Sequence, residues 1–243
     1  MDNTDFVVKN GCLVGYIGNS EHIKVPEEVT AIAAFAFEGN SHIKFVVIPN
    51  SVLEIGKAAF AECKNLTSVV LSNALTVIET QLFNGCEKLT KVSFPEKIKE
   101  IRRLAFYNCK SLVDIEFPQS LTVIGANAFE GCYSIKKLDL PGGLKRIGDR
   151  AFCRCKSLRE LTLRSKFFDL GQELFFEANN HVKLIYAGTS DEFFTLASSK
   201  TRTSRPFEAI GNIKKYIPIA IQNSRIEYKE NHTFCIEVEC QKD

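Results

Sequence analysis

Cysteines are the residues of this sequence best suited to chemistry, because thiolates bind metals and act as nucleophiles. Of the nine cysteines, five recur at an interval of 23 residues: Cys63, Cys86, Cys109, Cys132 and Cys155. One cysteine per stacked unit forms a row along the molecule, whereas a metal cage needs ligands that converge on one point. Thiols about 4.8 Å apart are also too widely spaced for the usual disulfide Cβ separation of about 3.8 Å. The spacing therefore predicts a buried ladder of thiols that hydrogen-bond weakly to turn backbone.

The other candidate chemical groups do not assemble into a site either. Cys153 and Cys155 form a C-x-C pair, which suits redox or metal chemistry only if further ligands lie nearby, and we expect Cys153 to lie on the exterior. No histidine falls near a serine, cysteine or carboxylate set, and no nucleophile elbow or phosphate-binding loop is present. The four histidines are His22, His42, His181 and His232. The sequence thus predicts no catalytic residues, no metal site, no cofactor and no enzymatic activity.

Phenylalanine follows the same 23-residue period, so the elements that position these groups are repeats. The phenylalanines are Phe37, Phe60, Phe83, Phe106, Phe129, Phe152 and Phe175. The shared unit is V-x-L-P-x-x-L-x-x-I-G-x-x-A-F-x-x-C-x-x-L. V-x-L alternates like a strand with one face buried, and the proline after it ends the strand. L-x-x-I-G predicts a second extended piece, and A-F-x-x-C predicts one turn of helix. Parallel pairing between stacked units predicts one continuous sheet along a face.

The repeat, as written from Ile48 to Leu66, resembles that of BspA-like leucine-rich repeat proteins. The resemblance covers residues 23–184 and implies a right-handed solenoid, mostly β with short helical turns, built from seven 23-residue repeats with terminal caps. Residues 1–22 resemble the hairpin that precedes such arrays, and residues 185–243 are expected to form a C-terminal cap with a helix and terminal strands. The family implies a bacterial scaffold for protein–protein interactions.

Composition and charge argue against nucleic acid and membranes as partners. A formal net charge of +2 provides no global field that would attract nucleic acid, and no apolar run is long enough to span a bilayer. The opening MDNTDFVVKNG carries acidic residues where a secretory signal would be basic and then apolar. We therefore expect a cytoplasmic protein from the chain as written, and a surface or secreted one if the chain is a trimmed form.

The outward side chains of the predicted sheet are the candidate binding site. Three apolar residues, Phe45, Val47 and Val70, lie next to polar ones in the repeat register, which is typical of an anchor for a partner. The candidate partner-binding residues are Phe45, Val47, Ser68, Val70, Lys91 and Ser93. In the alternative interpretation the N-terminal cap folds over these residues and buries them.

Three functional classes follow from these observations. The leading hypothesis is a non-catalytic scaffold that binds a protein of unknown identity through the exposed face of the sheet. The alternative is a cell-surface or secreted adhesin-type binder of host or matrix proteins. An enzyme that uses residues 195–243 is the third class, although a segment this short lacks a core to hold a site. The partner, the face that it uses and the oligomeric state cannot be read from one sequence.

Overall fold

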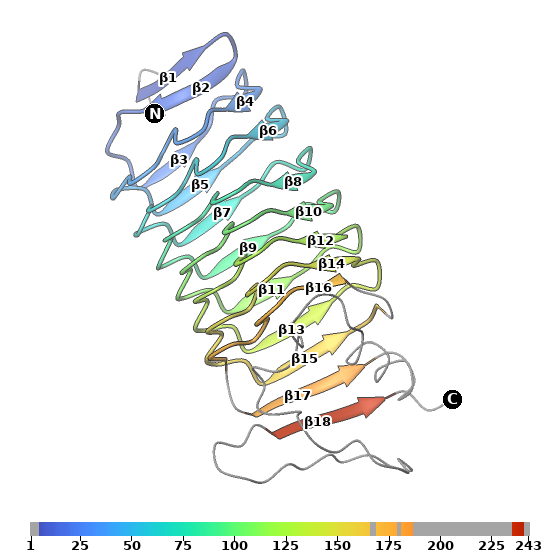
Figure 1. The fold of residues 1–243 in the computed structure, drawn as a ribbon. Coiled ribbons are helices and arrows are strands. Elements are labelled where there is room, and N and C mark those ends of the chain that lie inside the picture. Colours follow the sequence, from blue (N-terminus) through green and yellow to red (C-terminus); the bar gives the residue numbers. More distant parts are fainter. Residues whose placement is uncertain (1–4, 166–168, 179–180, 187–234, 241–243) are drawn as a thin grey trace, which may run out of the picture.

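The computed structural model describes residues 5–165, 169–178, 181–186 and 235–240. Within these ranges the chain winds into an elongated stack of coils, with a hairpin at the N-terminal end and long strands at the other end (Figure 1). All regular elements in the described ranges are β-strands, and the predicted solenoid is confirmed.

The V-x-L pieces form the strands of one face, as predicted. Within each sheet of this face a strand pairs in parallel with the strand of the next coil, so that a residue lies beside the residue 23 positions further on, as Val46 lies beside Val69. The central residue of these strands points inward and is buried in every coil from Ile23 to Leu161. The strands are β3 (His22–Lys24), β5 (Phe45–Val47), β7 (Ser68–Val70), β9 (Lys91–Ser93), β11 (Asp114–Glu116), β13 (Lys137–Leu140), β15 (Glu160–Leu163) and β17 (His181–Tyr186).

The second extended piece of each repeat is confirmed as a two-residue strand on a second face. Within each of two sheets these strands also pair in parallel with a register of 23 residues, as Glu100 does with Val123. They are β4 (Ala31–Ile32), β6 (Glu54–Ile55), β8 (Val77–Ile78), β10 (Glu100–Ile101), β12 (Val123–Ile124), β14 (Arg146–Ile147) and β16 (Asp169–Leu170). Each coil therefore closes on itself through two strands and the turns between them.

The expected continuous sheet is interrupted. On the first face the described strands form one sheet from β3 to β11 and a second from β13 to β18. The second face divides between β6 and β8. The break after β11 coincides with a change in the inward column at the strand ends, where Phe94 and Phe117 are followed by Leu140. The strands beyond the break are longer than those before it.

Both ends of the stack carry atypical strands, which solenoids need to cover their last apolar layer. At the N-terminal end β1 (Phe6–Lys9) and β2 (Cys12–Tyr16) form an antiparallel hairpin, and β2 pairs with β4 on the second face. At the other end β18 (Cys235–Cys240) pairs in parallel with β17. The helix expected in the C-terminal cap falls in residues 187–234, outside the described residues.

The A-F-x-x-C segment is a run of hydrogen-bonded turns rather than the expected turn of helix. In each coil a residue with positive φ lies two positions before the phenylalanine, and another precedes the cysteine position, for example Ala58 (φ 55°) and Glu62 (φ 57°). Left-handed residues interrupt a right-handed helix. They turn alternate amides toward the next coil, so that Phe60 N–H donates to Leu82 O and Glu62 N–H donates to Asn84 O.

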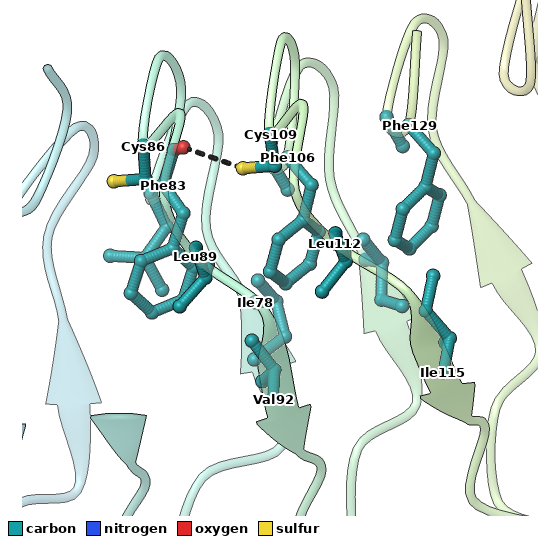
Figure 2. Close-up of a cluster of buried hydrophobic side chains, with 14 of the residues drawn as sticks. Ile78, Phe83, Cys86, Leu89, Val92, Phe106, Cys109, Leu112, Ile115 and Phe129 are labelled. Carbon is teal, nitrogen blue, oxygen red and sulfur yellow. Dashed lines mark hydrogen bonds between the residues drawn. The ribbon is translucent and has the colours of Figure 1, made fainter. Parts of the chain in front are cut away.

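The core is a column of phenylalanine rings that runs through all seven coils. Consecutive rings from Phe37 to Phe175 have centroids 4.7 to 5.7 Å apart and lie within 22° of parallel. Figure 2 shows three of these rings, Phe83, Phe106 and Phe129, above the inward side chains of the strands. The five central rings are fully buried, which confirms the register predicted from the period.

Phe106→Ala tests this column in the middle of the array. Removal of a fully buried ring leaves a cavity between two stacked neighbours and should lower the free energy of unfolding by about 3 to 5 kcal/mol. Denaturant melts followed by circular dichroism measure this change. The exposed substitution Phe35→Ala, at a ring outside the column, is the control and should cost much less. Equal stability of Phe106→Ala and the native chain would show that the register is wrong.

Candidate functional site

The in-register cysteines form the predicted ladder. Each thiol donates a hydrogen bond to the carbonyl oxygen of the phenylalanine in the preceding coil, at an S···O distance of 3.0 to 3.5 Å. Figure 2 shows one such bond, from Cys109 to Phe83. In the first coil Asn40 occupies the cysteine position, and its side-chain oxygen accepts from the amides of His42 and Ile43. The thiols are therefore structural hydrogen-bond donors.

Burial keeps these thiols protonated. It raises the pKa of Cys63 to about 12, and it raises the pKa values of Cys86, Cys109 and Cys155 well above the ordinary thiol value. The thiolate is the nucleophile and the metal ligand. The ladder consequently supplies neither a nucleophile nor a metal ligand at neutral pH.

Cys153 is buried, so the prediction that it lies on the exterior is wrong. The residue follows Phe152 on the outer ridge of the coil, where an exposed position was expected, but Arg150 folds over it with Nη2 3.3 Å from Sγ. Burial first, and then the negative charge of Glu130, raise the pKa of Cys153 to about 12. Its partner in the C-x-C pair, Cys155, belongs to the ladder, so the pair forms no redox or metal site.

Glu130 is a buried carboxylate beside Cys153, and sequence reasoning missed it. Its side chain is only 6% exposed and accepts hydrogen bonds from Arg150, whose Nη2 lies 3.2 Å from Oε1, and from Asn127 Nδ2. The same arginine pairs with Glu173 in the next coil. Burial acts to raise the pKa of Glu130, but the hydrogen bonds from Arg150 and Asn127 outweigh it and hold the pKa below its ordinary value of 4.5.

This cluster is internally satisfied, so its geometry is that of a structural contact between coils. Arg150 also lies over the ring of Phe176, with 5.5 Å from Cζ to the ring centroid. A general acid or base needs an open side toward a substrate, and Glu130 has none. Over the described part of the chain, His, Cys, Asp and Glu side chains form no group that could hold a metal ion.

The candidate binding residues lie together on the first face. In the strand register Phe45 lies beside Ser68, and Val47 lies beside Val70, which in turn lies beside Ser93. Phe45 and Val47 are half-buried, whereas Val70 is 47% exposed. His22 lies beside Phe45, with ring centroids 5.9 Å apart. We call Phe45, Val47 and Val70 the apolar patch.

The N-terminal hairpin does not lie on this patch. β2 adds to the second face by pairing with β4, as Figure 1 shows, while the patch is on β5 and β7 of the first face. The exposed fraction of Val70 also shows that the hairpin does not cover the patch, because a covered residue would be buried. The alternative in which the hairpin buries the patch therefore does not describe this structure.

Charged side chains of the first face differ between its two sheets. In the C-terminal sheet they pair across coils: Lys137 Nζ lies 3.4 Å from Glu160, and Arg164 makes two hydrogen bonds to Asp139 at 2.6 and 2.7 Å. In the N-terminal sheet, by contrast, Lys91 and Glu116 make no ion pair within the described ranges of the chain. Unpaired charge thus lies in the same sheet as the apolar patch.

A profile of the BspA type leucine rich repeat region, present in six copies, matches residues 10–135 and 78–197. Together these matches span more than half of the chain. The chain belongs to the BspA-type leucine-rich repeat family. No curated protein matches it significantly.

Solved structures of other bacterial leucine-rich repeat proteins are similar to this one. A leucine-rich repeat protein of Bacteroides ovatus has a TM-score of 0.57 and 24% identity over 75% of this chain and 62% of its own. The Treponema pallidum leucine-rich repeat protein has a TM-score of 0.54 and 29% identity over 76% of this chain and 80% of its own. The first similarity shows the fold alone, and this chain spans less than two thirds of that relative.

This BspA-type protein also has a hollow in the first face that sequence reasoning did not identify. It has a volume of about 230 Å³ and lies where β9 and β11 end, with Phe94 and Phe117 among its lining residues. Lys91 and Ser93 of the candidate set also line it, together with Glu96 and Glu116. The signal in the sequence was the pair of phenylalanines in a column that is otherwise aliphatic.

The thiol ladder of the BspA-type array predicts slow alkylation in the native state. At pH 8 the ladder thiols and Cys153 should stay unmodified by iodoacetamide, because they are buried and protonated, whereas all nine cysteines should react in denaturant. Peptide mass spectrometry after timed labelling measures each site. Fast labelling of Cys109 in the native chain would contradict the ladder.

Glu130→Gln should make stability less dependent on acidic pH. Because the folded pKa of Glu130 is lowered, its contribution is complete above about pH 4.5 and is lost as the pH falls through the folded pKa. We expect the free energy of unfolding of the variant to be lower by about 1.5 to 3 kcal/mol at pH 7, which is the range for a hydrogen bond to a charged group. At low pH its free energy of unfolding should approach that of the native chain. Urea melts across a pH series measure both.

Glu177→Gln is the matched control, because this carboxylate pairs with Arg154 on the same ridge but is half exposed. Solvent screens such a pair, so its loss should change stability little at any pH. A constant difference between native chain and Glu130→Gln at all pH values would argue against the buried ion pair.

Proposed function

We propose that this chain is a non-catalytic scaffold that binds a protein partner through the first face of its solenoid, at the strands β3 to β9. The observation that carries the proposal is the apolar patch of Phe45, Val47 and Val70, which is partly open to solvent. The inward side of the same sheet is packed into the core. Apolar side chains rimmed by polar ones are the usual centre of a protein interface.

The surroundings of the patch fit a rim. Ser68 and Ser93 lie next to it in the register, and Lys91 extends beyond Ser68 without an ion partner within the described ranges. Polar groups at the edge of an interface fix orientation and exclude water from the centre, while the apolar centre supplies most of the affinity. The paired charges of the C-terminal sheet leave fewer free groups for a partner.

The solenoid also gives the patch a rigid base. The inward residues of the same strands, Val46 and Val69, are buried, and parallel backbone pairing joins each strand to the next. A preformed surface avoids the entropy cost of ordering a loop when the partner binds. This supports recognition of a folded protein surface or an extended segment laid across several coils.

Catalysis forms no part of the proposal, because the family fold is typically non-catalytic and the buried thiols and Glu130 are engaged in packing. No helix in the described ranges is long and apolar enough to cross a membrane. The cytoplasmic location expected from the chain as written stays a prediction.

Affinity capture from lysate of the producing organism tests the proposal. The double variant Phe45→Asp, Val47→Lys places charge on the patch and should weaken partner binding by at least about 2 kcal/mol, the loss typical of a central interface residue. Quantitative mass spectrometry compares the proteins retained by the native chain and by the variant. A partner enriched by the native chain and lost with the variant supports binding through this face.

Leu53→Asp is the matched control, since it places an acid at an apolar side chain that is 64% exposed and lies just before β6 of the second face. It should retain the partner. Melting curves must show that both variants fold. The proposal fails if the native chain and the patch variant retain the same partner equally, or if Leu53→Asp alone abolishes capture.

A further inference from the structure

The hollow at the ends of β9 and β11 has an aromatic floor that is held in place from two sides. The ring of Phe94 packs edge-on against Phe106, with centroids 5.7 Å apart, and stacks at 6.1 Å on Phe117. Phe94 stays partly exposed, whereas Leu71 and Leu140 in the same column of other coils are buried. Phe94 therefore offers a partly exposed ring in the hollow, backed by the buried ring of Phe117.

The residues that line this hollow include two acidic ones and one basic one. Glu96 and Glu116 are exposed carboxylates that line it, and neither makes an ion pair over the described residues. Lys91 is the one positive group among the lining residues. Elsewhere on the same face carboxylates such as Asp139 and Glu160 have cationic partners. The hollow thus combines unpaired carboxylates with an aromatic floor.

We propose that this hollow binds a cationic side chain, an arginine or a lysine, of the protein partner. The inference rests on the proposed function and names the chemistry that the partner must present beside the apolar patch. The cationic head pairs with Glu96 and Glu116, and its methylene stem lies on the ring of Phe94. Charge-assisted hydrogen bonds to carboxylates and contact with an aromatic face are the two interactions that favour such a group.

Size and charge disfavour the other classes of occupant. About 230 Å³ is smaller than the roughly 300 to 1,000 Å³ of a typical small-molecule site and suits a single side chain. An anionic group would meet two carboxylates against one lysine. An apolar group would remove Glu96 and Glu116 from water without giving them partners, which is costly.

The arrangement also divides recognition between two places on one sheet. Ser93 lines the hollow and lies beside Val70 of the apolar patch, so the two features are contiguous across β7 and β9. A partner segment that places an apolar side chain on the patch and a basic one in the hollow would engage both. The patch supplies affinity, and the hollow supplies register and charge selectivity.

The test uses the full chain, labelled with ¹⁵N, and titrates it with N-acetyl-arginine methylamide while two-dimensional NMR spectra are recorded. Saturable shifts should appear at the amides of Ser93, Phe94 and Glu116, with a dissociation constant on the order of millimolar. The citrulline analogue has nearly the same shape without the charge and should bind at least about tenfold more weakly. Added salt should weaken arginine binding.

Two substitutions separate the parts of the site. Glu116→Gln removes one charge and Phe94→Leu installs the residue that other coils carry at this position, so both should fold and both should lower the affinity about tenfold or more. Glu54→Gln is the control, because Glu54 is an exposed carboxylate on the second face. It should leave the titration unchanged.

The inference is overturned if the arginine probe causes no saturable shifts at the hollow, if citrulline binds equally well, or if Glu54→Gln weakens binding as much as Glu116→Gln does. Failure of the probe leaves the proposed function intact, because that function is tested separately by capture through Phe45 and Val47. The patch variant Phe45→Asp, Val47→Lys should still bind the arginine probe, which keeps the two results distinguishable.

Discussion

Stacking of each phenylalanine ring on the ring of the next coil is the contact on which the rest of this structure depends. A single coil cannot bury its own ring, and its amides at Phe60 and Glu62 find their acceptors only in the following coil. The cysteine bonds run the other way, from each thiol to the phenylalanine carbonyl of the coil before. Backbone, thiol and ring therefore all require a neighbour of identical shape, which keeps the period at 23 residues through seven coils.

This requirement acts on the inward columns and leaves the outward ones free. Along the first face the buried residues stay apolar, while the outward positions change from Phe45 to Ser68 to Lys91 with no effect on the coil. Surface chemistry can thus vary from coil to coil on an unchanging frame. The apolar patch and the hollow beside it are two such variations, and both lie in the N-terminal sheet.

The groups that suggested chemistry are instead used for packing. A row of thiols with raised pKa values satisfies carbonyl oxygens in the core, and the buried Glu130 joins coils through Arg150 and Glu173. Cys153 shows how a local pattern misleads, because its exposure depends on an arginine side chain that folds back from the same turn. In a repeat protein, a reactive residue type indicates chemistry only after its neighbours in the adjacent coils are known.

The sequence alone determined the family, the period, the strands and the inward columns, because a constant spacing forces equivalent residues into equivalent places. It also pointed to Phe45, Val47 and Val70 as outward. Tertiary structure decided what lies across coils or around turns: the breaks in the two faces, the positive φ angles that replace a helical turn, the burial of Cys153 and the Glu130–Arg150 pair. It also decided that the hairpin joins the second face and that Phe94, Glu96 and Glu116 line one hollow. These features depend on side-chain directions and on contacts between segments about 20 residues apart, which periodicity cannot specify.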